Sequence, residues 1–128
     1  MSIQPGKAVS FAPDRRHRRF PRFRSHFPVT ITLFAGDKYH RMSAQCKDLS
    51  EAGIGLLVST ELKMGEVASL NFSPPGSSQI WDVSAVLRHR RGYHYGFEFI
   101  SLQPEQSATL KNSLKGLERA DYDRKDKN

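Results

Sequence analysis

Residues 79–99 constrain the fold more than any other part of the sequence. In the run 79–90 apolar and polar side chains alternate at most positions: Trp81, Val83, Ala85 and Leu87 form one face, and Asp82, Ser84, Arg88 and Arg90 form the other. A period of two places one face in a core and the other in water, which predicts a β-strand. The turn residues Arg91-Gly92 and a second alternating run, 93–99, follow. We therefore expect an antiparallel hairpin whose four aromatic residues in 93–99 share one buried face.

Shorter runs before this hairpin are rich in β-branched, aromatic and aliphatic residues. We expect strands at 27–34, 39–47, 54–58 and 67–72, with a turn at 35–37 and a break at 74–76. Pro104 followed by Glu105 predicts the start of a helix, and Leu110, Leu114 and Leu117 give it a narrow apolar stripe. The pattern predicts a mainly β domain, a small closed or nearly closed antiparallel barrel with the helix as its cap.

The net charge of +7 on this chain of 128 residues is concentrated at one end. Residues 1–24 carry seven basic side chains against one acidic side chain, or +6, which leaves +1 for the rest. All six basic residues in 15–24 are arginines. A terminal block of like charge repels itself and engages an anionic partner. We therefore expect a flexible basic arm at 15–24 and a partner that bears phosphate.

Length and composition fit one domain. We expect a disordered lead-in at 1–14, a domain with its arm at 15–117, and a disordered charged tail at 118–128. The sequence contains neither an apolar run long enough to span a membrane nor a signal-peptide pattern, so we expect a cytoplasmic protein. Cys46 is the only cysteine, which excludes an intramolecular disulfide. We expect a buried thiol there and not a nucleophile.

The first segment with candidate chemistry is Arg18-Arg19-Phe20-Pro21-Arg22. Pro21 biases Phe20 towards extended geometry, so the arginines project separately from a stiffened stretch. A guanidinium binds phosphate oxygens or the O6/N7 edge of guanine bidentately, and it also stacks on a purine. Taken alone, the segment is more typical of a solvated basic tail that is loosely attracted to nucleic acid or lipid.

The second segment, 48–56, lies between two expected strands. Asp48 and Ser50 are two residues apart in an extended stretch, so they point to the same side and match the N1–H and N2–H₂ donors of guanine. We expect Gly53 to supply a positive φ for the turn and Gly55 to allow a close approach to the backbone. Taken alone, this segment is more typical of an ordinary turn held by an Asp or Ser side chain.

Together the two segments resemble the paired signature of the PilZ domain family, Arg-x-x-x-Arg followed by Asp-x-Ser-x-x-Gly. The matching positions are Arg18, Arg22, Asp48, Ser50 and Gly53. The resemblance extends to the strand 95–99 and to the helix after Pro104, and it covers roughly residues 15–117. It implies a six-stranded antiparallel β-barrel with a C-terminal capping helix, and a bacterial receptor for the second messenger cyclic di-GMP.

The resemblance also implies roles for individual residues. Arg18 and Arg22 would hold guanine and phosphate with help from Arg19, Asp48 and Ser50 would contact the base, and Gly53 would shape the turn. We add Arg15, Arg16 and Arg88 as further expected ligand contacts. Six arginines in the arm exceed the need of one dinucleotide with two phosphates, so we expect two stacked cyclic di-GMP molecules per chain, with one as the alternative. Ligand binding would change the conformation and signal to an unidentified protein that controls motility, exopolysaccharide or surface attachment.

Two other classes of function fit the sequence less well. The histidines show neither a metal-ligand spacing nor a carboxylate partner at a helical interval, and no glycine-rich loop precedes a helix. We therefore expect no catalysis, no metal and no cofactor. A basic-armed barrel that binds RNA or single-stranded DNA is the alternative, but it calls for a basic face on a body whose net charge is only +1. We accordingly expect that nucleic acid is not the partner.

Overall fold

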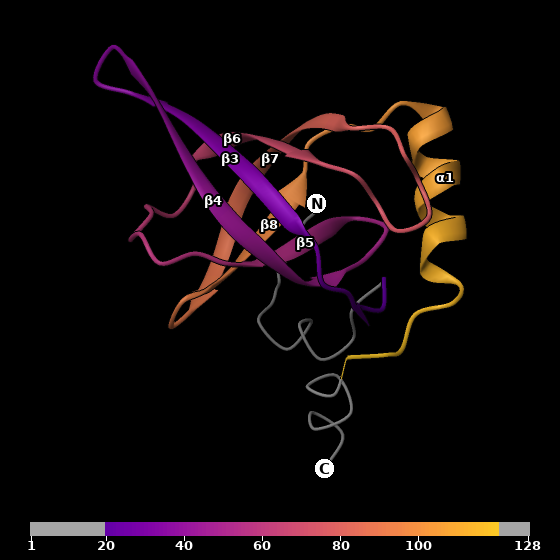
Figure 1. Cartoon of the computed structure of the whole chain (residues 1–128). Coiled ribbons are helices and arrows are strands. Elements are labelled where there is room, and N and C mark those ends of the chain that lie inside the picture. The colour runs from indigo at the N-terminus through magenta and orange to yellow at the C-terminus, as the bar shows by residue number, and fades with distance from the viewer. Residues whose placement is uncertain (1–19, 121–128) are drawn as a thin grey trace, which may run out of the picture.

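The computed structural model describes residues 20–120 as short antiparallel strands followed by one helix. The elements are β2 (Phe23–Arg24), β3 (Pro28–Ala35), β4 (Lys38–Leu49), β5 (Gly53–Leu57), β6 (Val67–Phe72), β7 (Trp81–Arg91), β8 (His94–Phe99) and α1 (Pro104–Leu114). The strand order is β2-β4-β3-β6-β7-β8-β5, and an additional β4–β5 pairing joins the two ends of the sheet. Six strands thus close into a barrel, with β2 added at β4 and α1 beside the barrel (Figure 1). This architecture confirms the predicted fold.

The turn residues determine the two tight hairpins. The β3–β4 loop is Gly36-Asp37, whose φ angles of 59° and 68° meet the requirement of a type I′ turn. The β7–β8 loop is Gly92-Tyr93, with a φ of 61° at Gly92. It lies one residue later than the predicted Arg91-Gly92 turn. Tyr93 is consequently 65% exposed and does not join the buried aromatic face expected for it.

The barrel interior is apolar, as the alternating pattern predicts. The buried side chains of 93–99 are Tyr95, Phe97 and Phe99, and those of 79–90 are Trp81, Val83, Ala85 and Leu87. The helix begins at the predicted Pro104 and buries Leu110 and Leu114, while Leu117 lies beyond its end and is partly buried. Cys46 is fully buried, which confirms its predicted environment. Burial, and then the negative charge of Asp48, raise the pKa of the Cys46 thiol.

The two ends of the described chain pair with each other. Phe23 pairs with Leu49 of β4 and also forms a bridge with Arg119. The Ala120 N–H donates to the carbonyl of Arg22 at 3.0 Å, and Ala120 is buried. We expected a flexible arm over all of 15–24 and a disordered tail from 118, but 22–24 and 118–120 are held by backbone pairing and burial. Residues 15–19, 121–128 and the expected lead-in 1–14 lie outside the described residues.

Candidate functional site

A β-bulge in β4 places Asp48 on the outer face of the barrel. The register shifts between Cys46, which pairs with Leu56, and Asp48, which pairs with Gly55, so Lys47 is the extra residue. A bulge reverses the in-and-out alternation beyond it. Cys46 therefore faces the core whereas Asp48, two residues later, faces outward. The prediction that Asp48 lies between two strands is wrong, because β4 continues through this bulge to Leu49.

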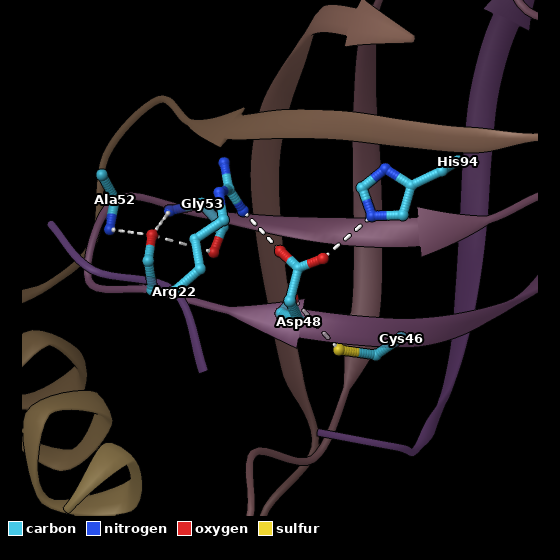
Figure 2. A network of polar contacts seen from close by, with 7 residues as sticks. Arg22, Cys46, Asp48, Ala52, Gly53 and His94 are labelled. Atoms are coloured by element: carbon cyan, nitrogen blue, oxygen red, sulfur yellow. Dashed lines mark hydrogen bonds and ion pairs between the residues drawn. The ribbon is translucent and has the colours of Figure 1, made fainter. Parts of the chain in front are cut away.

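Asp48 is the centre of a buried polar network (Figure 2). Its Oδ1 accepts a hydrogen bond from Nη1 of Arg22 at 2.7 Å, and its Oδ2 lies 2.9 Å from Nε2 of His94. The Asp48 side chain is only 1% exposed and that of Arg22 11% exposed. Both carboxylate oxygens thus contact protein groups. Asp48 thus holds the Arg22 guanidinium in this structure, and the base contact expected for Asp48 stays a prediction.

Ser50 holds the turn between β4 and β5. Its Oγ accepts hydrogen bonds from the backbone N–H groups of Ala52 at 3.1 Å and Gly53 at 3.0 Å. The Ser50 N–H donates to the Gly53 carbonyl at 2.9 Å. The structure therefore contains the serine-held turn that we left open as an alternative reading of this segment. Ser50 is 2% exposed, but it contributes to the wall of a cavity.

Three glycines let other groups lie flat against the outer face of this sheet. The expected positive φ at Gly53 is wrong; glycine is needed there because a Cβ would collide with the Phe97 carbonyl. The close approach expected at Gly55 is present, since a Cβ would lie 2.7 Å from both Asp48 Oδ1 and His94 Nε2. At Gly96 a Cβ would lie 2.6 Å from Nδ1 of His89. Larger residues at these positions would displace the network or the His89 ring.

A second bulge, in β7, contributes the opposite side of the site. The register shifts between Leu87 and His89, so Arg88 is the extra residue. The Arg88 Nε donates to Oε1 of Glu98 on β8 at 2.7 Å, and the two side chains are 61% and 52% exposed. Bulges re-aim side chains at the edges of functional sites. Arg88 and Glu98 accordingly form an exposed ion pair on the outer face.

A cavity of about 340 Å³ lies on this face. Its lining comes from the N-terminal segment, the β4–β5 turn and the β7–β8 strands: Phe20, Arg22, Ser50, Ala52, Gly53, Arg88, His89, Phe97 and Glu98. The volume is in the range of small-molecule pockets, and the walls combine cationic, aromatic and backbone groups. Four predicted site residues, Arg22, Ser50, Gly53 and Arg88, therefore meet at one cavity, and Asp48 supports it through Arg22.

The remaining predicted site residues, Arg15, Arg16, Arg18 and Arg19, lie outside the described residues. Sequence reasoning missed His94, whose carboxylate partner is distant in sequence, and it missed Phe20, His89 and Glu98. Only Glu98 had a usable pattern, because alternation in 93–99 places it on the polar face. Within residues 20–120 no cluster of three or more His, Cys, Asp or Glu side chains could hold a metal ion. In the same part of the chain no helix is both long and apolar enough to cross a bilayer.

These features define a class of protein: a closed six-stranded antiparallel barrel with a cavity on its outer face that is lined by arginine, glutamate and aromatic side chains. Comparison with known families assigns the class. The family model of the PilZ domain matches residues 15–116. The chain therefore belongs to the PilZ domain family.

Solved structures share the fold at low sequence identity. The PilZ domain of YcgR from Escherichia coli, solved with c-di-GMP, is 21% identical with a TM-score of 0.60, over 78% of this chain and 90% of that chain. The PilZ domain of CeSA from a cellulose-synthesizing bacterium is 14% identical with a TM-score of 0.56, over 74% and 95%. MotI, an inhibitor of motility from Bacillus subtilis, is 15% identical with a TM-score of 0.62 over 76% of this chain; the match spans 48% of MotI, about half its length. No curated protein sequence matches.

Proposed function

We propose that this protein is a non-catalytic receptor for cyclic di-GMP. The observation that carries the proposal is the meeting of two motifs at one cavity. Arg22, the last arginine of the first motif, is bonded to Asp48 of the second, and Ser50 and Gly53 of the second motif line the same cavity as Arg22. Membership of the PilZ family and the likeness to a PilZ domain solved with c-di-GMP support the same ligand.

The cavity lining suits an anionic ligand with aromatic bases. Arg22 and Arg88 offer guanidinium groups, which bind phosphate oxygens or a guanine edge and stack on purines. Asp48, which is itself in contact with His94, holds Arg22 in place, so part of the geometry exists before a ligand enters. In this proposal Arg18 and Arg19 add contacts to guanine and phosphate, and Arg15 and Arg16 add positive charge.

We further propose that binding changes the conformation of the arginine segment and thereby signals to a partner protein in the bacterial cytoplasm. The control of motility, exopolysaccharide or surface attachment is the proposed output. The similar solved structures support these outputs, since MotI is an inhibitor of motility and the CeSA domain comes from a cellulose-synthesizing bacterium.

Calorimetric titration with cyclic di-GMP, GMP and a short single-stranded oligonucleotide tests the ligand. We expect the Kd for cyclic di-GMP to be micromolar or lower, with GMP and the oligonucleotide much weaker. Arg18→Ala should weaken binding by roughly 2 kcal/mol, as expected for a charge-assisted bidentate contact. Arg41→Ala, an exposed arginine of β4 outside the cavity, is the matched control and should bind as wild type does. Tighter binding of the oligonucleotide, or equal losses in both variants, would contradict the proposal.

The same titration measures stoichiometry when the protein concentration is far above the Kd. We propose two stacked ligands per chain, because six arginines in 15–24 supply enough positive charge for four phosphates. A molar ratio near one would reject the stacked pair and leave the receptor assignment standing.

A further inference from the structure

The Arg88–Glu98 pair leaves polar atoms available at the cavity. The pair joins Nε of Arg88 to Oε1 of Glu98 at 2.7 Å. Among residues 20–120, neither the terminal nitrogens of Arg88 nor Oε2 of Glu98 has a hydrogen-bond partner. Two terminal nitrogens of Arg88 and one oxygen of Glu98 are therefore presented side by side on the outer face.

A carboxylate in the wall of a phosphate-binding cavity has an electrostatic cost. Glu98 lines the cavity together with Arg22 and Arg88, and a phosphate beside Glu98 would meet like charge. The cost disappears if Glu98 faces a neutral base that donates hydrogen bonds. Glu98 thus makes the β7–β8 side of the cavity suited to a base, and it leaves the side at Arg22 for phosphate.

Guanine complements the exposed atoms of this pair. Its O6 is an acceptor, while N1–H and N2–H₂ next to O6 are donors. Terminal N–H groups of Arg88 can donate to O6, and Oε2 of Glu98 can accept from N1–H and N2–H₂. Adenine presents a donor at N6 and an acceptor at N1. The Arg88 donors would then face a donor, and the Glu98 acceptor would face an acceptor.

We infer that Arg88 and Glu98 read the guanine edge, and that Glu98 determines the specificity for guanine over other purines. The inference rests on the proposed function and adds Glu98 to the ligand site. Both residues stand on paired strands, and the bulge at Arg88 brings its side chain next to Glu98.

A dinucleotide analogue with inosine in place of guanine isolates the contact. Inosine keeps O6 and N1–H but lacks the N2 amine. We expect wild type to bind cyclic di-GMP about tenfold or more tightly than cyclic di-IMP, the size of one charge-assisted hydrogen bond. In Glu98→Ala this ratio should fall close to one. In Arg88→Ala both affinities should fall and the ratio should remain, because both bases keep O6.

Glu61→Ala is the matched control, since Glu61 also pairs with an arginine, Arg90 at 3.4 Å, but does not line the cavity. It should keep the wild-type ratio. Equal losses for both ligands in Glu98→Ala would mean that Glu98 only orients Arg88, and would overturn the inference. A wild-type ratio near one would overturn it as well. Absence of any cyclic di-GMP binding to wild type would instead overturn the proposed function, and this inference with it.

Discussion

Oδ1 of Asp48 lies 2.7 Å from Nη1 of Arg22, so residues 26 positions apart in two sequence motifs form one buried ion pair. Each charge would be costly if it were buried alone. His94 contacts the other carboxylate oxygen and completes the arrangement. Substitutions in either motif should therefore change stability as well as ligand binding.

Asp48→Ala should lower the free energy of unfolding by about 3 kcal/mol, because it removes a buried carboxylate that is paired with the Arg22 guanidinium. Urea denaturation measures this loss. The double variant Arg22→Ala with Asp48→Ala should lose less than the sum of the two single variants, by 1 kcal/mol or so. Strict additivity would show that the pair contributes no coupling.

Gly53→Ala should destabilise the barrel by about 1–3 kcal/mol, because the new Cβ meets the backbone carbonyl of Phe97, which cannot move alone. Gly116→Ala is the control, since a Cβ there meets nothing within 4 Å. Thermal unfolding of the two variants provides the comparison. A Gly53→Ala variant that is as stable as wild type would mean that β5 and β8 separate easily at this point.

Most of the fold could be predicted from local patterns. The alternation at 79–90, the turn at Gly36-Asp37 and the start of the helix at Pro104 are each determined by neighbouring residues, and the structure has them. The site was harder to predict from the sequence. The bulges before Asp48 and at Arg88 arise from pairing with distant strands, so the sequence shows neither the outward direction of Asp48 nor the Arg88–Glu98 pair.

The same limit explains the error at Gly53. Glycine in a turn suggests a positive φ, whereas the actual constraint is the carbonyl of Phe97, which lies 44 positions away in sequence. Likewise, the contact of His94 with Asp48 follows from the closure of the barrel and has no local pattern.

Stability should depend on pH through Cys46 above its ordinary pKa of 9.0. Folding raises the pKa of this thiol, so above pH 9.0 the unfolded chain loses the proton first. The contribution of the protonated thiol to the free energy of unfolding is complete below that pH. Above it, this contribution declines by about 1.4 kcal/mol per pH unit. Urea titrations between pH 8 and pH 11 give the free energy of unfolding at each pH. Above pH 9 this free energy should fall more steeply with pH in wild type than in Cys46→Ala, by roughly this amount per pH unit. The same pH dependence of the unfolding free energy in both proteins would indicate that the folded thiol ionises normally.

Limited proteolysis should distinguish the packed part of the arginine segment from exposed loops. Arg22 is buried and its carbonyl is bonded to Ala120, so trypsin should cut after Arg22 more slowly than after the exposed Lys63. Mass spectrometry of early fragments gives the order of cleavage. Rapid initial cleavage after Arg22 would show that β2 opens readily from β4.

The pairing of Phe23 with both Leu49 and Arg119 connects the cavity side of the barrel to the segment after α1. A displacement of Arg22 large enough to separate β2 from β4 would also release 118–120. The backbone of β4 at Asp48 and Leu49 would then present unpaired N–H and C=O groups, which another chain can use to add a strand. The short strand β2 thus covers an edge of β4 that would otherwise be open to strand addition.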